Sequence, residues 1–241
     1  MPRDIEYHDT YVIKRGPPAE IQLESARLRA AAGLSAGRVP RVVREEGGAL
    51  HLERIDDLVA VGHHLPRARD RAGLCERVGA VLAHVHRDFH PPGVDCAQDQ
   101  VALHGDYSAY NIQLHLPTDE LVLLDWLPAA WLPDAPLCGP PSVDLAVLWL
   151  SLGFQPVMSR YSLRHPGRLA LAALEGYQRA GGSASAVEVA RTTVDLLPAY
   201  EAMRFRTAPR QEHIRLRPTQ VRIRWFLNTV VLLDRLVRGV S

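Results

Sequence analysis

Three polar side chains in the middle of the chain have the types and the spacing of a phosphoryl-transfer site. Asp106 ends the segment LHGD (residues 103–106), Asn111 follows five residues later, and Asp125 follows the apolar run 121–124. Residues just beyond strand ends are held rigidly and still face an open edge of the structure. A carboxylate and an amide oxygen there are hard ligands of the kind that Mg²⁺ prefers, and a further carboxylate can accept a proton from a hydroxyl nucleophile. These residues therefore predict a general base and two ligands of a metal ion on phosphates.

Lys14 is the one lysine among 28 basic residues, and all the others are arginine. A coding bias toward arginine explains this composition. A position that keeps lysine under such a bias is a candidate for a compact point charge rather than a planar guanidinium. Lys14 matters only if it lies where a mechanism requires that charge; otherwise it is an ordinary lysine on the surface of a strand.

The elements that would hold these residues change in character along the chain. The first third predicts strands around one helix, whereas most of the remainder has the period of helices. The predicted strands are Ile5–Tyr7, Thr10–Lys14, Val39–Arg44, Ala49–Ile55, Val101–Leu103, Ile112–Leu116 and Leu121–Leu124. The predicted helices are Ala19–Ala32, Arg69–His90 and those that follow residue 142, after a proline-rich loop over Leu127–Pro141. We expect an α+β fold with a boundary near residue 57.

The pattern HGD-x4-N, followed by an apolar strand and the pair Asp125-Trp126, resembles the catalytic and metal-binding segments of the aminoglycoside phosphotransferase family, relatives of the protein kinases. Other segments similar to that family are Val85-His86, Ser142–Ala146, Tyr11–Lys14 at the strand of the kinase lysine, and Glu24 at the position of that lysine's partner. The resemblance covers roughly residues 11–150 in separate blocks. It implies a bilobal protein-kinase-like fold, with a reduced strand-rich N-terminal lobe over residues 1–57 and a mostly helical C-terminal lobe over residues 58–241.

The resemblance also implies a role for each matching residue. Asp106 would orient and deprotonate an acceptor hydroxyl, and Asn111 and Asp125 would hold Mg²⁺ on the phosphates of ATP or GTP. Lys14, held by Glu24, would contact the phosphates. The segment Leu52–Ile55, which includes Glu53, Arg54 and Ile55, would be a hinge whose backbone meets the nucleotide base. His104 and Asp144 would brace the catalytic loop. The implied activity is Mg-dependent transfer of the nucleotide γ-phosphate to a hydroxyl of a small molecule by a cytoplasmic kinase.

The N-terminus departs from the pattern of the family. Only 13 residues precede Lys14 and none is glycine, so a glycine-rich phosphate loop between two full strands does not fit there. A catalytically idle, nucleotide-binding pseudokinase with a regulatory role is therefore the alternative to an active phosphotransferase, and resistance to a specific antibiotic is a third possibility. For Asp144, the competing interpretation is an N-cap of the apolar helix that follows.

The C-terminal segment bears on the charge of the acceptor. From Tyr200 to Ser241 there are nine arginines against two glutamates and one aspartate, a local net charge of +6. Because like charges repel in a cleft of low dielectric, enzymes that phosphorylate polycationic aminoglycosides need an acidic acceptor pocket. If this segment lines the acceptor site, a neutral or anionic acceptor fits better. If it forms a solvated helix face, it carries no information about the acceptor.

Charge and hydropathy argue against two other classes of partner. A net charge of +1 indicates neither a nucleic acid nor a membrane surface. The most apolar runs, Leu145–Phe154 and Trp225–Leu233, are too short to span a bilayer. The first ten residues also lack the apolar stretch of a signal peptide. We expect a cytoplasmic protein.

The cysteines and the clustered histidines indicate no metal centre. Cys75, Cys96 and Cys138 form no Cys-x-x-Cys pair, so they predict neither a zinc site nor a disulfide framework and suit a reducing cytosol. The three histidines of segment 84–90 have no nearby cysteine or glutamate that completes a ligand set. We expect structural or solvated roles for them.

Overall fold

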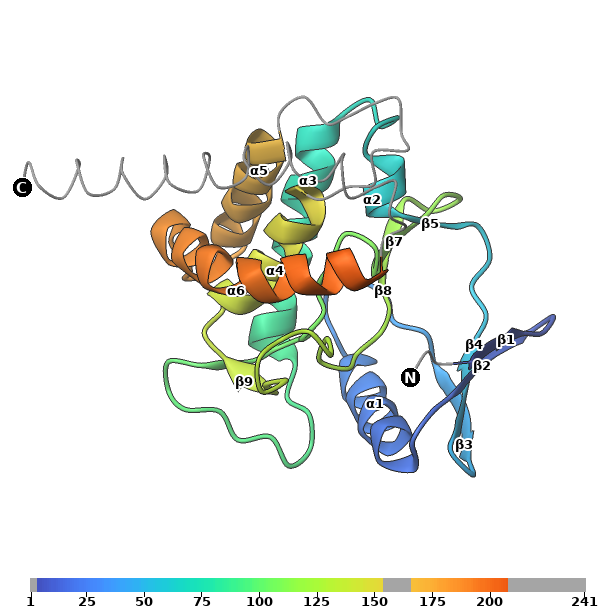
Figure 1. Cartoon of the computed structure of the whole chain (residues 1–241). Helices are drawn as coiled ribbons and strands as arrows, with labels where there is room; N and C mark the ends of the chain where they lie inside the picture. Colours follow the sequence, from blue (N-terminus) through green and yellow to red (C-terminus); the bar gives the residue numbers. More distant parts are fainter. Residues whose placement is uncertain (1–3, 154–165, 208–241) are drawn as a thin grey trace, which may run out of the picture.

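The computed structural model describes residues 4–153 and 166–207, which form an α+β fold with antiparallel sheets (Figure 1). Its strands are β1 (Asp4–Tyr7), β2 (Tyr11–Arg15), β3 (Val42–Glu46), β4 (Ala49–Glu53), β5 (Leu58–Ala60), β6 (Val101–Ala102), β7 (Ile112–His115), β8 (Glu120–Leu123) and β9 (Cys138–Gly139). Its helices are α1 (Pro18–Ala31), α2 (Val61–His64), α3 (Arg71–Asp88), α4 (Ser142–Gly153), α5 (Pro166–Arg179) and α6 (Ala186–Thr207). Within these ranges, no helix has both the length and the apolar character needed to cross a membrane.

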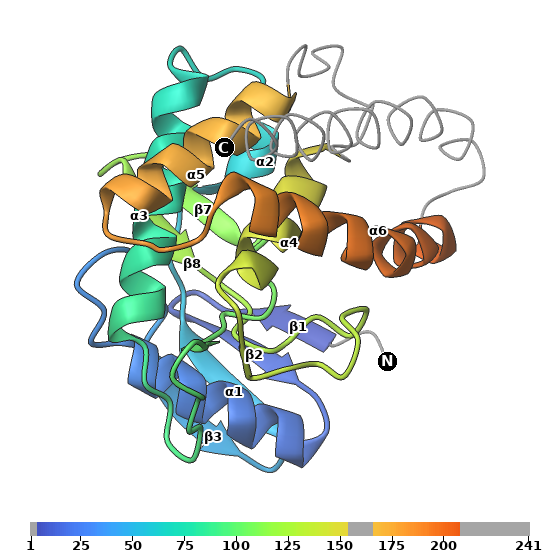
Figure 2. The same cartoon turned by 90° about the vertical axis from the view of Figure 1, so that its left-hand side faces the viewer.

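A four-stranded antiparallel sheet, in the order β1-β2-β4-β3, forms one side of the molecule, and α1 packs against it (Figures 1 and 2). Lys14 of β2 pairs with Leu50 of β4. Gly47 and Gly48, at φ 55° and 81°, make the turn between β3 and β4, which requires a left-handed backbone. α1 begins at Pro18, where a missing N–H costs nothing because the first turn leaves that donor unpaired. The predicted order of strands, helix and hairpin in this region is confirmed.

Helices α3 to α6 lie on the other side of the molecule, and the sheet β5-β7-β8 lies between them and the four-stranded sheet (Figures 1 and 2). β7 and β8 form a hairpin in which Ile112 pairs with Leu123. The sequence did not predict β5, and the residues after Asp57 were expected to be helical. A strand of three residues has no visible alternation, and β5 exists because Val59 pairs with Leu114 of β7.

Two glycines allow α3 and α5 to cross at very short range. A Cβ atom built on Gly79 would lie 1.7 Å from the carbonyl oxygen of Ala173, and one built on Gly176 would lie 1.9 Å from the carbonyl oxygen of Glu76. In both cases the clashing atom belongs to the backbone, which cannot move away as a flexible side chain can. The packing of these two helices therefore requires a residue without a side chain at both positions.

Gly79→Ala should lower the free energy of unfolding by about 1–3 kcal/mol, because the added methyl group forces α3 away from α5. Urea denaturation measures the loss. Gly33→Ala is the matched control, since a Cβ at Gly33 would meet nothing within 4 Å. An equal effect of the two substitutions would contradict this account of the packing.

A disulfide joins Cys96 to Cys138, with their Cα atoms 5.6 Å apart. The prediction of no disulfide is therefore wrong. The two cysteines are 42 residues apart in the sequence, and no local pattern links them. They meet because β6 pairs with β9, a strand inside the proline-rich loop that was predicted to have no strand. Cys75 is a buried free thiol, and burial raises its pKa to about 12.

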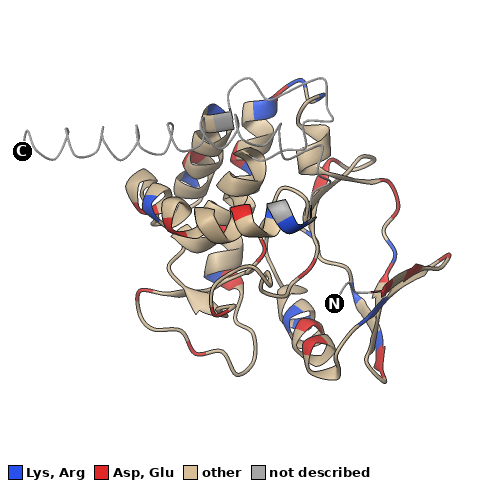
Figure 3. Ribbon diagram, viewed as in Figure 1, with Lys and Arg blue, Asp and Glu red and all other residues tan. Residues whose placement is uncertain are grey.

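Acidic and basic residues alternate along the described helices and strands (Figure 3). Neither sign is confined to one group of elements in this view.

Candidate active site

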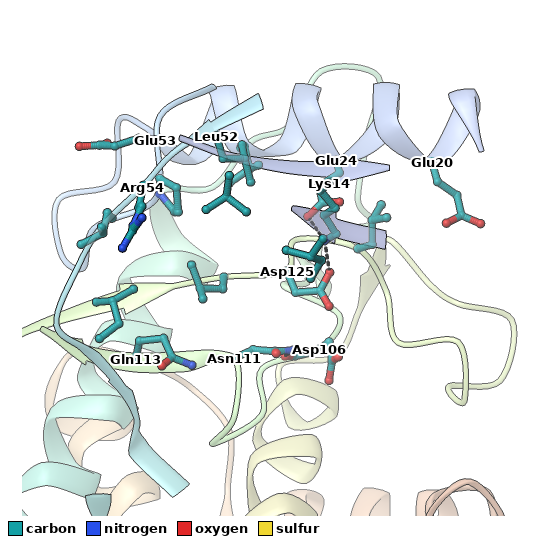
Figure 4. Close-up of a pocket in the computed structure, with 18 of the residues that line it drawn as sticks. Lys14, Glu20, Glu24, Leu52, Glu53, Arg54, Asp106, Asn111, Gln113 and Asp125 are labelled. Carbon is teal, nitrogen blue, oxygen red and sulfur yellow. Dashed lines mark hydrogen bonds and ion pairs between the residues drawn. The ribbon is translucent and has the colours of Figure 1, made fainter. Parts of the chain in front are cut away.

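A pocket contains the side chains whose spacing suggested phosphoryl transfer. It is bordered by β2, α1, the segment from β4 to β5, the loop before β7 and the loop after β8. The lining residues of interest are Lys14, Glu24, Asp106, Asn111 and Asp125. Figure 4 shows Lys14 and Glu24 next to Asp125, with Asn111 and Asp106 on the opposite wall. Residues from distant parts of the sequence thus converge on one place.

Lys14 is nearly buried, and two carboxylates hold its ammonium group. Its Nζ donates to Glu24 Oε1 at 2.5 Å and to Asp125 Oδ1 at 2.8 Å. The side chain of Lys14 is 10% exposed and that of Glu24 is 1% exposed. A charge is buried to this extent only when it is paired. Lys14 is therefore a fixed cation in the pocket wall, and the alternative of a surface lysine is wrong.

The β7–β8 hairpin brings Asn111 and Asp125 together. Asn111 directly precedes β7, Asp125 lies just beyond β8, and the N–H of Leu124 donates to the Asn111 carbonyl at 2.9 Å. Asp125 has a φ of 56°, a left-handed conformation that aspartate adopts more readily than most residues other than glycine.

Asp106 is partly buried, and hydrogen bonds fix its backbone on both sides. Its N–H donates to His104 Nδ1 at 3.3 Å. Its carbonyl accepts from the N–H of Ser108 at 2.7 Å and from Asn111 Nδ2 at 3.0 Å. Because the amide nitrogen of Asn111 is used in this way, its amide oxygen is the atom that can bind a cation.

Asp144 is fully buried in the first turn of α4 and holds the loop before Asp106. Its Oδ2 accepts from the N–H of His104 at 2.8 Å, and its Oδ1 accepts from the N–H of Gly105 at 2.9 Å. His86 Nε2 lies 3.0 Å from the same Oδ2. Burial alone raises the pKa of this carboxyl group, but the hydrogen bond and charge of His86 outweigh burial and keep the pKa below its usual value. Because α4 begins at Ser142, Asp144 lies inside the first turn and not at the N-cap position, and its carboxylate binds the loop of His104 and Gly105.

No protein-family model and no curated protein sequence matches this chain. Solved structures do match it. A choline/ethanolamine kinase family protein from Mesorhizobium loti is similar with a TM-score of 0.60 over 96% of this chain and 93% of that chain, at 13% identity. An aminoglycoside-3'-phosphotransferase of type VIII is similar with a TM-score of 0.52 over 82% and 93%, at 16% identity. A glucosamine kinase, solved with glucosamine, ADP and inorganic phosphate, is similar with a TM-score of 0.55 over 99% and 82%, at 14% identity.

This chain has the fold of the small-molecule kinases. The resemblance to aminoglycoside phosphotransferases that the motifs predicted is thus confirmed for the fold. Within this kinase-like fold, β2 carries Lys14, α1 carries Glu24, and the two ends of the β7–β8 hairpin carry Asn111 and Asp125. The convergence of these residues with Asp106 is observed, and the roles assigned to them remain predictions.

The predicted hinge, Leu52–Ile55, lies on the wall of the pocket. The side chain of Glu53 is used elsewhere, because it forms ion pairs with Arg38 at 2.6 Å and with Arg41 at 3.3 Å. Figure 4 shows the Glu53 carboxylate directed away from Asp106 and Asn111. The predicted contact between a nucleotide base and the backbone of this segment remains a prediction.

His104 is packed behind the pocket and is absent from the described lining. The centre of its ring lies 4.5 Å from that of Trp126 and 5.5 Å from that of Tyr107. Burial lowers the pKa of His104 to about 4, and the charge of Asp144 only partly offsets this. A neutral buried ring that accepts from the N–H of Asp106 supports the loop of Asp106 and does not line the described pocket, in keeping with the predicted role as a brace.

The depressed pKa of His104 predicts a loss of stability in mild acid. The folded state holds the ring neutral down to about pH 4, whereas the unfolded state takes up a proton below its ordinary pKa of 6.5. Between these values the unfolded chain binds more protons, so the free energy of unfolding falls as the pH falls, by about 3 kcal/mol in all. Urea denaturation between pH 7.5 and 4 measures this slope. His104→Asn should flatten it, and an unchanged slope in that variant would assign the acid sensitivity to other groups.

The sequence analysis missed Arg27, which is fully buried in α1. A signal was present in the sequence. Glu24 and Arg27 lie on the same face of α1 as Leu28 and Ala31, and this face is buried. Charged residues at inward positions indicate buried polar contacts.

Among the histidines of segment 84–90, His86 has the structural role that was predicted, since it contacts Asp144.

Proposed function

We propose that this chain is a phosphotransferase that moves the γ-phosphate of ATP or GTP onto a hydroxyl group of a small molecule. The observation that carries the proposal is the pocket in which Lys14, held by Glu24 and Asp125, lies across from Asp106 and Asn111. Phosphoryl transfer asks the protein mainly for positioning and charge. A buried cation, two oxygen ligands and a carboxylate base in one pocket supply both.

The proposal divides the chain into two lobes around this pocket. Residues 1–57 would form a nucleotide-binding lobe, and residues 58–241 would form a catalytic and acceptor-binding lobe. The lining of the pocket supports this division. β2 and α1 contribute lining residues from the first part of the chain, and the loops beside β7 and β8 contribute lining residues from the second part. The backbone of segment 52–55 would meet the base of the nucleotide.

The residues at the end of the β7–β8 hairpin fit Mg²⁺. Asn111 and Asp125 offer an amide oxygen and a carboxylate oxygen, and Mg²⁺ is commonly held by one or two such protein ligands together with waters and substrate phosphates. In the described part of the chain, no group of three or more His, Cys, Asp and Glu side chains could hold a metal ion. Waters and the nucleotide phosphates would complete the coordination. When bound, the ion would neutralise charge on the phosphates.

The acceptor is proposed to be a small molecule with a hydroxyl group that is neutral or cationic rather than anionic. The described acidic lining residues are Glu20, Glu24, Glu53, Asp56, Asp57, Asp106 and Asp125, and the basic ones are Lys14 and Arg54. The loop after β8 adds the apolar residues Leu127, Pro128, Ala129, Ala130, Ala135 and Leu137. Because acidic residues outnumber basic ones in this lining, a neutral acceptor would meet less repulsion than an anionic one, and a cationic acceptor would also fit. Mg²⁺ would offset this repulsion for the nucleotide phosphates. Of the nine arginines behind the prediction of a neutral or anionic acceptor, Arg204 and Arg206 lie in the last turn of α6 and do not belong to the described lining, and the other seven lie beyond residue 207, outside the described residues.

Phosphate transfer from γ-labelled ATP or GTP to a panel of hydroxyl compounds, in the presence of Mg²⁺, tests the proposal. Choline, amino sugars, macrolides and aminoglycosides belong in the panel. Lys14→Met should abolish most of the transfer, whereas Arg67→Met, at an exposed position, should not change it. Failure of the unaltered protein to phosphorylate any member of a broad panel would reject the proposal.

A nucleotide-binding pseudokinase is the second candidate. The observation in its favour is the connection between β1 and β2, which consists of residues 8–10 and contains no glycine. Backbone N–H groups of a glycine-rich loop that would cover the phosphates are missing from that connection. Tight binding of nucleotide and Mg²⁺ without turnover, measured by calorimetry and by the same labelled assay, would favour this candidate.

The cytoplasmic location remains a prediction, and the disulfide between Cys96 and Cys138 argues against it. Disulfides are rare in reducing compartments. Mass spectrometry of protein alkylated inside cells before lysis decides the matter. A reduced pair in cytoplasmic protein would support the predicted location, and an oxidised pair found in another compartment would reject it.

A further inference from the structure

Arg27 donates to the backbone of two loops that border the pocket. Its Nε donates to the carbonyl of Trp126 at 2.5 Å. Its Nη2 donates to the carbonyls of Leu103 and His104, the latter at 3.3 Å. The residue is 0% exposed, and its guanidinium carbon lies 4.9 Å from the centre of the Phe89 ring. One side chain thus links α1 to both loops.

The burial of this cation needs an explanation. A buried guanidinium costs free energy unless its N–H groups are hydrogen-bonded. Nη1 has no hydrogen-bond partner within residues 4–153 and 166–207. Burial lowers the pKa of Arg27 to about 10, although Asp144 and Glu24 contribute favourable charge, so the group is still charged at neutral pH. A side chain that served only to fill this space would be apolar and would avoid the cost.

The contacts of Arg27 lie next to the groups proposed to act on phosphate. One carbonyl belongs to the residue directly after Asp125, and another belongs to the residue two positions before Asp106. Arg27 itself lies three residues after Glu24, about one turn along the same helix. The three segments that must keep a fixed separation for phosphate transfer therefore meet at one guanidinium.

We propose that Arg27 is a positioning residue for phosphoryl transfer, which fixes the loops of Asp106 and Asp125 relative to each other and to α1. This inference rests on the proposed function. The planar guanidinium presents its N–H groups as a rigid fork and can bind the carbonyls of two segments at once. A lysine ammonium at the same place is a flexible point charge. Arg27→Lys therefore keeps the positive charge but no longer fixes the distance between the two loops.

The test compares Arg27→Lys and Arg27→Met with Ile21→Ala, a control on the same helix. Ile21 is 1% exposed and does not belong to the described lining of the pocket. Urea denaturation measures the stability of each variant. Steady-state kinetics with ATP and an accepted hydroxyl compound give kcat and KM. Hydrogen–deuterium exchange reports on the amides of segments 103–106 and 123–126, and this measurement does not depend on activity.

Arg27→Lys should lower kcat by about 100-fold, which is the effect of a displacement of about 1 Å at a reacting group. The KM for the nucleotide should change little, and the amides of both loops should exchange faster than in Ile21→Ala. An unchanged kcat in Arg27→Lys would overturn the proposal. So would an equal fall of kcat in Ile21→Ala at the same loss of stability. If Arg27→Met does not fold, Arg27→Lys alone carries the comparison.

The exchange measurement separates this inference from the proposed function. If the unaltered protein transfers no phosphate, the proposed function fails. The contrast between Arg27→Lys and Ile21→Ala then still shows whether Arg27 holds the two loops. Faster exchange in both loops of Arg27→Lys supports that role, and equal exchange in the two variants overturns it.

Discussion

Asp106→Asn should lower kcat by about 10²–10⁴-fold, the usual contribution of general-base catalysis. An amide has the shape of the carboxylate but cannot take a proton from the acceptor hydroxyl. The hydrogen bonds of this residue to His104, Ser108 and Asn111 use its backbone, so they survive the substitution. We therefore expect the folded structure, the stability and nucleotide binding to persist. Labelled phosphate transfer at saturating ATP measures the fall in kcat.

Asp119→Asn provides the control for this substitution. Asp119 is an exposed residue whose carboxylate pairs with Arg77, and its side chain is 69% exposed. The same chemical change there should leave kcat unaltered. If Asp106→Asn retained most of its activity, another group would have to act as the base, or the reaction would proceed without one.

Asp144→Ala should lower the free energy of unfolding by about 3–5 kcal/mol, as the removal of one partner from a buried charged network does. The N–H groups of His104 and Gly105 would lose their acceptor, and so would His86. The N–H of Gly105 has little room to find a new acceptor, because a Cβ built on Gly105 would lie only 2.8 Å from the Cα of Pro128. Urea denaturation measures the loss, and any folded fraction should have a lower kcat because the loop before the base is released.

Two further variants show whether the effect is specific to this network. Asp144→Asn keeps the volume and one acceptor oxygen, so its loss of stability should lie between zero and that of Asp144→Ala. Glu46→Ala removes an exposed ion pair with Arg44 and should cost less than about 1 kcal/mol. Equal losses in Asp144→Ala and Glu46→Ala would mean that the buried carboxylate does not hold the loop.

Local sequence determined the elements and one half of the site. The strands β2, β4, β7 and β8 and the helices α1 and α3 were predicted close to their observed bounds, because alternation and helical period are properties of neighbouring residues. The convergence of Asn111 and Asp125 has the same origin. They flank a hairpin, and the pairing of Ile112 with Leu123 brings its two ends together.

The motif also placed Asp106 in the pocket, because the segment from Asp106 to Asn111 is short. Its carbonyl is bound directly by the Asn111 side chain. A spacing of this kind leaves the chain little freedom, so the sequence alone restricts the geometry. By contrast, the short β5 and β9 could not be predicted, since each exists only because another strand offers it an edge.

Only the tertiary structure decided how the two sides of the pocket meet. Lys14 and Asp125 are 111 residues apart, and their ion pair depends on how the four-stranded sheet packs beside the β7–β8 hairpin. The contacts of Arg27, the hydrogen bonds to Asp144 and the disulfide of Cys96 and Cys138 arise in the same way. Local pattern fixes which residues each element presents. The contacts between distant elements follow from the packing of whole surfaces, which no short stretch of sequence contains.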